Sequence, residues 1–168
     1  MNVRVRAWLG TLGFLVAAPG VVAGLIPWII TRWQIPWTGG WVWPIVIVAG
    51  AGILGGVAVL LDAFIRFARA DGTPAPVAPT AHLVVVGPYR YVRNPMYVAV
   101  LTIILAQALL FGSWATLVYA GITLLAVASF VRFYEEPTLV ETYGDEYREY
   151  RRHVRAWIPR VSAWSAGS

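Results

Sequence analysis

The chain contains no cysteine and no lysine, and only 12% of its residues are charged. Without cysteine it can form no disulfide, no catalytic thiol and no cysteine-based metal site. The two histidines, His82 and His153, are far apart in the sequence and lack metal-ligand spacing. A soluble domain carries about 25% charged residues. The composition is therefore typical of a membrane protein, and we expect no metal.

The basic residues that are present are all arginine. There are 13 of them against 8 acids, a net charge of +5, in a chain that is 59% hydrophobic. This excess is too small to indicate a nucleic-acid partner. Arginines near the ends of membrane helices are explained by topology and by lipid headgroups. We therefore expect the lipid bilayer as a partner and no nucleic acid.

Four apolar segments are long enough, or nearly so, to cross a membrane as helices, which needs about 20 residues. They run over residues 8–30, 41–65, 96–111 and 114–133. Pro19 and Pro27 predict a kink in the first. Only Gly112 and Ser113 separate the last two, which should form a tight antiparallel hairpin. The expected fold is all-α: a polytopic membrane protein with about four transmembrane helices, residues 1–168 forming a single membrane domain.

The N-terminus also has the pattern of a signal peptide, with Arg4 and Arg6 before an apolar run. The apolar part, residues 7–30, is longer than the apolar region of a typical signal peptide. We therefore expect a retained first span, so that residues 1–65 hold two N-terminal transmembrane helices.

The arginines predict the orientation of these helices. Only Arg32 lies at the end where five tryptophans gather between residues 28 and 43, whereas twelve arginines lie at the opposite end or beyond it: Arg4, Arg6, Arg66, Arg69, Arg90, Arg93, Arg132, Arg148, Arg151, Arg152, Arg155 and Arg160. Because positively charged loops stay inside, both termini and the 66–95 segment are expected in the cytoplasm. The tryptophans would form an interfacial belt on the other face.

Three features of the N-terminal half have simple structural interpretations. Residues 50–56 contain a literal G-x-G-x-x-G, but no strand–helix alternation surrounds it, so close helix packing is expected rather than a dinucleotide site. Asp62 and Arg66 are spaced for an ion pair within one helix; a place in the wall of a site is the alternative. The proline-rich residues 71–79 predict an extended connector or the rim of a site.

The C-terminal region predicts an amphipathic helix. Its aromatic and apolar residues recur three or four positions apart: Tyr143, Tyr147, Tyr150, Val154 and Trp157. Acidic residues come early in it and arginines late, which complements the helix dipole. The helix could lie on the membrane surface or act as a lid over a site, and the two roles are compatible.

A polar run at residues 87–97, GPYRYVRNPMY, leads into the third apolar segment; we call it the arginine–tyrosine segment. Pro95 suits the first turn of a helix, which makes Asn94 the expected N-cap. The free N–H groups of that helix start are a natural seat for a carboxylate. Arg90 and Arg93 add positive charge.

A second polar cluster closes the fourth apolar segment. It consists of Glu135 and Glu136, which we call the glutamate pair, and Pro137, which is expected to end the helix. Because the last two apolar segments form a hairpin, both clusters should reach the same membrane face. Together they predict a pocket for a zwitterion with a further cationic centre. The simpler alternative is that these residues are anchors at helix ends.

Several motifs in order resemble the isoprenylcysteine carboxyl methyltransferase family, which is similar in turn to the phospholipid N-methyltransferases. They are residues 87–97, then Glu135, Glu136 and Leu139, then residues 143–150 and 154–160. The resemblance covers about residues 72–160. It implies a helical membrane methyltransferase that uses S-adenosylmethionine, with residues 66–168 as its cofactor-binding and catalytic part. Asn94 stands where better-known eukaryotic members have histidine, so no role that needs an imidazolium carries over.

The resemblance also assigns residues by position. Those implied in catalysis are Arg93, Asn94, Glu135 and Glu136. Those implied in cofactor binding are Gly87, Tyr89, Arg93, Asn94, Pro95, Tyr97, Glu135, Glu136, Tyr147, Tyr150 and Arg160. The expected reaction is methyl transfer to a lipophilic acceptor, with O-methylation of a carboxylate favoured. Methylation of a phospholipid or amine nitrogen, or a non-catalytic membrane module, are the alternatives. The expected location is a bacterial inner membrane, with the site on the cytoplasmic face.

Overall fold

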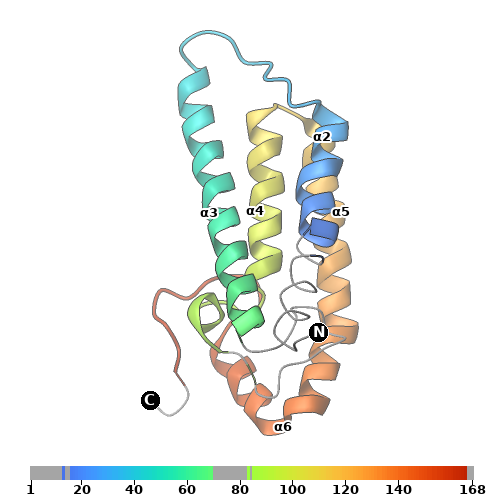
Figure 1. The fold of residues 1–168 in the computed structure, drawn as a ribbon, viewed down its shortest axis with the longest axis vertical. Coiled ribbons are helices and arrows are strands. Elements are labelled where there is room, and N and C mark those ends of the chain that lie inside the picture. Colours follow the sequence, from blue (N-terminus) through green and yellow to red (C-terminus); the bar gives the residue numbers. More distant parts are fainter. Residues whose placement is uncertain (1–12, 14–15, 70–82, 84, 166–168) are drawn as a thin grey trace, which may run out of the picture.

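The computed structural model describes residues 13, 16–69, 83 and 85–165, and every regular element within them is a helix (Figure 1). The elements are η1 (Val16–Leu25), α2 (Ile26–Thr31), α3 (Val42–Arg69), η2 (Gly87–Arg90), α4 (Pro95–Leu110), α5 (Trp114–Phe130), η3 (Val131–Glu135) and α6 (Glu136–His153). The expected all-α class is confirmed for this part of the chain. The start of the expected first helix and the connector at 71–79 lie outside the described residues.

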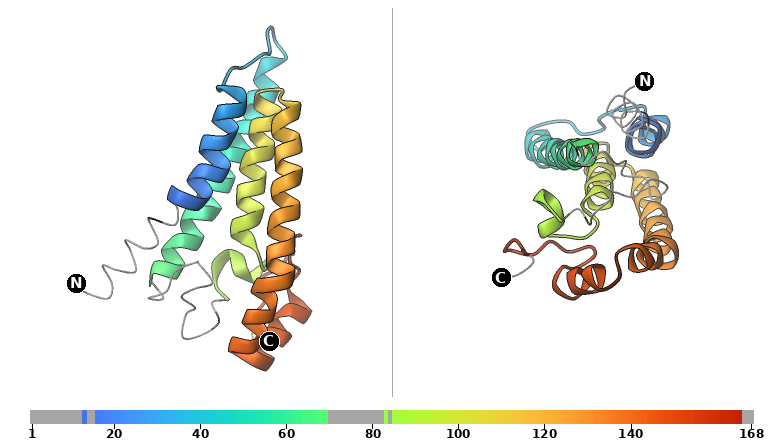
Figure 2. Two further views of the ribbon diagram at one scale, coloured as in Figure 1. Left: turned by 90° about the vertical axis from the view of Figure 1, so that its right-hand side faces the viewer. Right: turned by 60° about the horizontal axis from the view of Figure 1, so that its bottom comes forward.

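Helix α4 lies between α3 and α5 and provides half of the buried residues in the core of the bundle (Figures 1 and 2). Its buried residues Ala99, Val100, Ile103 and Ile104 pack against residues of α3, η1 and α5. The outer faces of α3 and α5 stay apolar although they are exposed; Leu54 is 72% exposed and Leu125 is 70% exposed. Exposed apolar surface on this scale is suited to lipid rather than to water.

Two helices are apolar and long enough to cross a membrane by length and composition: Val42–Arg66 and Trp114–His153. Two shorter apolar helices, Ala18–Thr31 and Pro95–Leu110, lie beside them. The apolar part of Trp114–His153 ends at about residue 133, before the glutamate pair. The protein is therefore membrane-associated, and a crossing by four helices stays a prediction.

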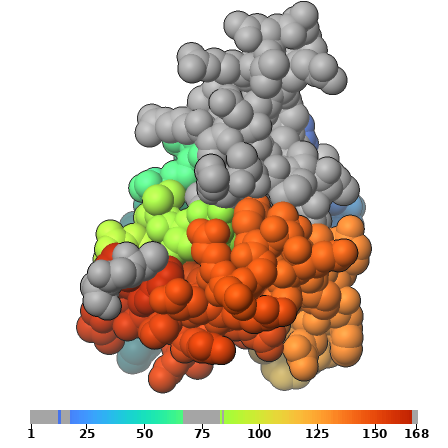
Figure 3. All heavy atoms as spheres, turned by 90° about the horizontal axis from the view of Figure 1, so that it is seen from below, coloured from blue at the N-terminus to red at the C-terminus, as the bar shows by residue number. Residues whose placement is uncertain are grey.

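The two ends of the bundle differ. The 32–41 connection and the α4–α5 turn share one end, which we call the tryptophan end (Figure 1). There the indole N–H of Trp37 donates to the last carbonyls of α4, at 3.3 Å from Leu109 O and 2.9 Å from Leu110 O. The arginine–tyrosine segment and α6 lie at the opposite end, which we call the site end (Figure 3).

Proline shapes the N-terminal helix. Pro19 lies inside the π-helical η1, and Pro27 lies in the first turn of α2. Because proline has no N–H, Pro27 cannot bond to the carbonyls one turn before it. Two neighbouring helices supply donors instead: Gln107 Nε2 lies 2.6 Å from Ala23 O, and Tyr119 OH lies 2.9 Å from Val22 O.

The glycine run of α3 serves helix packing, as expected. A Cβ on Gly56 would meet the Ile103 side chain and, at 3.0 Å, the Ala99 carbonyl oxygen, and a Cβ on Gly52 would lie 3.1 Å from the Ala106 Cβ. Small residues thus let α3 and α4 approach closely. The ion pair between Asp62 and Arg66 is also present, with 2.8 Å between Oδ2 and Nε.

Two expectations about the last helices were wrong. Pro137 does not end a helix; it lies in the first turn of α6, where its missing N–H is tolerated, and α5 continues through the π-helical η3 into α6. The amphipathic helix does not reach Trp157. It bends at Gly144, whose φ of 55° and ψ of −124° are non-helical, and it ends at His153, after which Val154 is extended.

Candidate functional site

Residues 155–164, which we call the C-terminal segment, lie along the arginine–tyrosine segment, although about sixty residues separate them in the sequence (Figure 3). Backbone N–H groups of Arg93 and Asn94 donate to the carbonyls of Arg155 and Ala156, at 2.9 and 3.3 Å. In the other direction, the N–H groups of residues 160 and 164 donate to the carbonyls of residues 91 and 90, at 2.9 and 3.0 Å. These bonds fix the polar segment in one conformation.

A buried ion pair joins the two polar clusters. Arg93 Nη1 donates to Glu136 Oε1 at 2.8 Å, and the two side chains are 10% and 7% exposed. The same nitrogen donates to the hydroxyl of Tyr147 at 3.3 Å. Glu136 also faces Arg151 at 3.4 Å and, more loosely, Arg132 at 3.9 Å. One carboxylate thus balances three guanidinium groups, which leaves the local charge positive.

Arg93 keeps one donor without a partner. Its Nε is the single fully buried side-chain nitrogen or oxygen, among the described residues, that has no hydrogen bond. A buried donor that is left unsatisfied costs about 1–3 kcal/mol. Such an atom in a cluster of positive charge is what an anionic ligand would satisfy.

The other glutamate has a different environment. Glu135 Oε2 accepts a hydrogen bond from the hydroxyl of Tyr97 at 3.0 Å, and the Tyr97 ring lies 6.5 Å from that of Trp157 between centroids. Burial raises the pKa of Glu135, and the neighbouring charge of Glu136 adds to that rise, whereas the Tyr97 hydrogen bond opposes it. Glu135 is therefore an acid next to aromatic faces, whereas Glu136 is held by arginines.

Two tyrosines of α6, Tyr147 and Tyr150, pack against the arginine–tyrosine segment. Tyr150 donates to the Tyr89 carbonyl at 2.6 Å, and Tyr147 and Tyr150 are each 3% exposed. Burial raises the pKa of both hydroxyls and also that of the Tyr89 hydroxyl. Positive φ at Gly144 makes this contact possible, because the bend turns the second half of α6 back toward the arginine–tyrosine segment.

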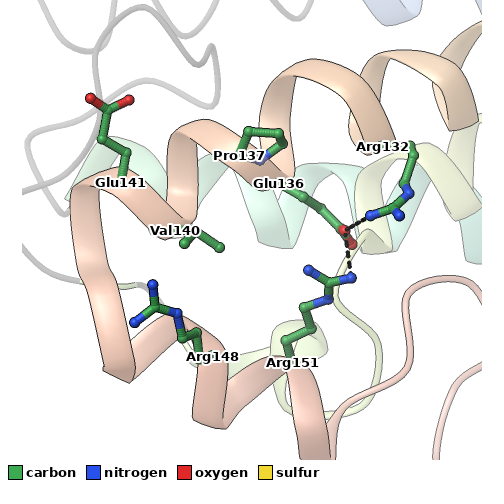
Figure 4. Close-up of a pocket in the computed structure, with 7 residues that line it drawn as sticks. All are labelled: Arg132, Glu136, Pro137, Val140, Glu141, Arg148 and Arg151. Atoms are coloured by element: carbon green, nitrogen blue, oxygen red, sulfur yellow. Dashed lines mark ion pairs between the residues drawn. The ribbon is translucent and has the colours of Figure 1, made fainter.

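A polar cavity of about 510 Å³ lies between the two halves of α6, with Arg132 of η3 also in its lining (Figure 4). Arg132 and Arg151 both point toward Glu136, while Arg148 and Glu141 lie on the other side of the cavity. Val140 and Pro137 complete the lining. Glu136 therefore lies between the buried Arg93 and an open, arginine-lined space.

Four of the residues assigned by resemblance take part in contacts other than those with the glutamate pair. Asn94 occupies the N-cap position, but its side chain makes no cap hydrogen bond, because its φ of −117° and ψ of 55° are not those of a regular cap. Arg160 Nη1 donates to the His153 carbonyl at 2.9 Å and so caps α6. Pro95 is buried in the first turn of α4. Gly87, with φ of 56°, leaves room for the Arg66 guanidinium.

Three residues of this site were not assigned from the sequence. Arg132 and Arg151 face Glu136, and Trp157 faces Tyr97. The spacing of Arg132 and Glu136, one helical turn apart, is the one local signal. Arg151 and Trp157 come into place through the bend at Gly144 and the end of α6, and the sequence pattern pointed to a straight helix there.

The comparisons with known proteins point to one family. A family model described as phospholipid methyltransferase matches residues 45–146, which is more than half of the chain. The match includes most of α3, the arginine–tyrosine segment and the glutamate pair, and it ends just before Tyr147.

Two relatives match shorter stretches. Protein-S-isoprenylcysteine O-methyltransferase of Schizosaccharomyces pombe is 35% identical over 81 residues, which are 48% of this chain and 34% of that protein. An uncharacterized protein of Haemophilus influenzae is 36% identical over 63 residues, which are 38% of this chain and 100% of that protein. The chain thus spans about a third of the yeast enzyme. The expected resemblance is confirmed, and the chain belongs to the phospholipid methyltransferase family of membrane methyltransferases.

Proposed function

We propose that this protein transfers a methyl group from S-adenosylmethionine to a lipophilic acceptor, with O-methylation of a carboxylate favoured. The observation that carries the proposal is the buried Arg93–Glu136 pair, whose Arg93 Nε has no partner. Family membership supports the reaction type, and the name of the yeast relative supports the acceptor class.

The residues at the site end fit the groups that this cofactor carries. Its carboxylate matches the unsatisfied Arg93 Nε and the positive charge around it. Its ammonium matches Glu135, which has no arginine partner among the ion pairs of the described residues. Its sulfonium matches the faces of Tyr97 and Trp157, since cations are attracted to aromatic rings. When bound, the cofactor would supply an electrophilic methyl group.

The protein's contribution would be mainly positional. Methyl transfer is a direct displacement, so holding the two reactants in line accounts for much of the rate. The rigid pairing of residues 90–94 with residues 155–164 provides such a fixed wall. A carboxylate acceptor has an ordinary pKa of about 4 and needs no base. Asn94, which cannot carry a charge, is compatible with that chemistry.

N-methylation of an amine or phospholipid is the second candidate. The raised pKa of Glu135 favours it, because an amine must lose a proton and a carboxylate with a raised pKa is a better base. The family description also names phospholipid. The two candidates differ in whether Glu135 must accept a proton.

Calorimetry with the purified protein tests cofactor binding. We expect S-adenosylmethionine and its demethylated product to bind to the wild type, and binding to weaken about 100-fold in Arg93→Gln, because a buried charge-assisted contact is lost. Arg148→Gln is the matched control, since Arg148 is exposed at the far rim of the polar cavity. Absence of binding to the wild type would refute the proposal.

Transfer of a radiolabelled methyl group then separates the two candidates. An S-isoprenylcysteine and a phospholipid with a primary amine headgroup are supplied in parallel. O-methylation predicts label in the first and full activity on it for Glu135→Gln at saturating cofactor. N-methylation predicts label in the second and loss of that activity in the same variant.

We further propose that the site end faces the cytoplasm of a bacterial inner membrane, in line with the arginine distribution. The lack of cysteine makes the test simple. A cysteine at exposed Gly39 should react with a membrane-impermeant maleimide in intact spheroplasts, whereas one at Ser162 should react only after lysis. The reverse pattern would overturn the orientation.

A further inference from the structure

The polar cavity between the two halves of α6 carries an excess of positive charge. Its charged lining residues are three arginines and two glutamates: Arg132, Arg148, Arg151, Glu136 and Glu141. Glu136 is also bonded by the buried Arg93 at 2.8 Å, and Arg93 does not line the cavity. Part of the negative charge of the lining is therefore neutralised from outside, and the guanidinium groups dominate the space.

These guanidinium groups can still donate to a further partner. Arg151 Nη2 and Arg132 Nη1 lie 3.4 and 3.9 Å from Glu136 Oε2, whereas charge-assisted hydrogen bonds are about 2.7–2.9 Å long. Arg148 has a close partner in Asp145, at 2.8 Å, but the Asp145 side chain is 94% exposed. Ion pairs with an exposed partner contribute little. All three arginines can therefore turn their donors to a group placed in the cavity.

The chemistry of the lining favours a phosphate group. Guanidinium groups around one space suit an anion with several oxygen acceptors, and arginine binds phosphate in this way. S-adenosylmethionine fits less well, because its two positive charges outnumber its one carboxylate. The uncharged lining residues are Pro137 and Val140, so no aromatic ring of the described residues is available there to stack on its adenine. A volume of about 510 Å³ is ample for a phosphate headgroup.

The cavity lies at the end of the apolar part of α5. Residues 114–131 contain no charged side chain, and at 1.5 Å per residue they extend over about 27 Å. This is close to the hydrocarbon thickness of a bilayer, about 30 Å. With α5 crossing the membrane, as predicted, Arg132 comes to the level of the lipid headgroups. Phe133 and Tyr134, which follow it, are exposed aromatic residues of the kind that gathers at membrane interfaces.

We propose that the polar cavity binds the phosphate group of an anionic phospholipid, at a position separate from the cofactor. The inference goes beyond the proposed function, since it requires that α5 crosses the membrane but not that a methyl group is transferred. Anionic lipids are concentrated in the cytoplasmic leaflet, which the site end is proposed to face. A phosphate between Arg132 and Arg151 takes up their excess charge, so that the Glu136 carboxylate is left to Arg93.

Native mass spectrometry of the purified protein in a neutral detergent tests the site without cofactor or turnover. Phosphatidylglycerol and phosphatidylcholine with the same acyl chains are added in parallel. Phosphatidylglycerol has no amine to be methylated, and phosphatidylcholine carries a choline that cancels its phosphate charge. We expect one phosphatidylglycerol to bind at least about ten-fold more tightly, because only its headgroup makes charge-assisted hydrogen bonds without opposing charge. Equal affinity for the two lipids would overturn the proposal.

A pair of arginine variants locates the lipid. Arg132→Gln should weaken phosphatidylglycerol binding about ten-fold, because one charge-assisted partner is lost. Arg152→Gln is the matched control: Arg152 is an exposed residue of α6 that does not line the cavity. Arg132 is also exposed, so the unfolding temperature should stay the same in both variants. Equal weakening in Arg152→Gln would mean a general attraction to positive charge and would overturn the cavity as the site.

A glutamate variant gives the opposite result, which misfolding cannot imitate. Glu141→Gln removes a negative charge from the lining and should tighten phosphatidylglycerol binding about three-fold, the size of an exposed charge interaction. Glu146→Gln, on the same helix but outside the lining, should leave the affinity unchanged. Tightening of the same size in both variants would contradict binding in the cavity.

Inorganic phosphate distinguishes a lipid from a free anion as the occupant. Added at the same concentration as phosphatidylglycerol, it should not displace the lipid, because the acyl chains hold the headgroup at the interface. Displacement at equal concentration would overturn the lipid as the occupant and assign the cavity to a free phosphate.

Discussion

The contact between α3 and α4 and the site end are stabilised by different physical interactions. Between the two helices, Gly52 and Gly56 lie against Ala106 and Ile103, and no charge takes part in those contacts. At the site end, Glu136 is paired with Arg93, and tyrosine hydroxyls and backbone carbonyls from distant parts of the chain complete the contacts. The first region depends on shape, and the second depends on charge and hydrogen bonding.

This difference predicts how each region responds to change. In the apolar region the driving force between helices is van der Waals packing, so small volume changes should alter stability gradually. At the site end a single lost partner leaves a buried charge uncompensated, which costs several kcal/mol. Function should therefore be most sensitive where charges are buried.

The largest effect is expected for Glu136→Gln. The change removes the charge that Arg93 and Arg151 share and should destabilise the protein by about 3 kcal/mol. Cofactor binding should fall at least about 100-fold by calorimetry, because the Arg93 side chain loses its anchor. Glu141→Gln, an exposed neighbour on the rim of the same cavity, should behave like the wild type. Equal behaviour of the two variants would contradict the contrast between buried and exposed charge.

Gly144→Ala should have the next largest effect. Its φ of 55° and ψ of −124° are strained for a residue with a Cβ, although no neighbouring atom would be hit. Backbone strain of this kind costs about 1–3 kcal/mol, and thermal unfolding should show it together with weaker cofactor binding. Gly121→Ala, at an open helical position of α5, should be neutral or stabilising. A helical Gly144→Ala variant with full binding would show that the bend is dispensable.

Gln107→Leu should have a moderate effect in the apolar region. Gln107 supplies the donor to the Ala23 carbonyl, and its loss should lower stability by about 1 kcal/mol without changing cofactor affinity. Tyr119→Phe should cost a similar amount for the Val22 carbonyl. Thr102→Val is the control for stability, since that hydroxyl bonds within its own helix. A loss of cofactor binding in Gln107→Leu would mean that the two regions are coupled.

The smallest effect concerns the pH dependence of stability. The pKa of Glu135 is raised in the folded state, so the folded protein keeps a proton that the unfolded chain has already lost. The contribution of Glu135 to the stability of the fold is therefore fully present below the ordinary carboxyl pKa and is lost as pH rises through the raised pKa. Glu135→Gln should remove this loss and raise the unfolding temperature at neutral pH by about 2 °C.

The same variant, Glu135→Gln, should also change the affinity for the cofactor. The amide can still accept the Tyr97 hydrogen bond, but it cannot attract an ammonium. Glu135→Gln should therefore be more stable than the wild type at neutral pH and bind the cofactor more weakly. A variant that is less stable at neutral pH would show that the carboxylate, rather than the neutral acid, is the favoured form.

Local sequence patterns were sufficient to predict where α3 and α4 lie. The structure places α4 at Pro95–Leu110, where 96–111 was expected, and α3 at Val42–Arg69, where 41–65 was expected. Long apolar runs fix a helix in any apolar environment, because the backbone must bond to itself. The glycines of α3 and the Asp62–Arg66 pair could likewise be interpreted from spacing alone.

Helix ends and bends were harder to predict. Pro137 has the same local chemistry whether it ends one helix or starts the next, and the π-helical turn before it decides the outcome. The bend at Gly144 was not predicted, because the regular spacing of the aromatic residues favours a continuous helix. Asn94 had the residue type of a cap, but the C-terminal segment fixes its backbone through the Ala156 carbonyl.

The sequence by itself determined that this is an apolar helical protein with two polar clusters, and its motifs identified the family, because composition and spacing are local properties. The tertiary structure decided which partner each charge has. Glu136 pairs with Arg93 and Arg151, whereas Glu135 accepts a hydrogen bond from Tyr97. Gly55 faces open space, whereas Gly56 packs against Ile103. Adjacent residues on a helix point about 100° apart, so only the arrangement of the neighbouring helices separates their roles.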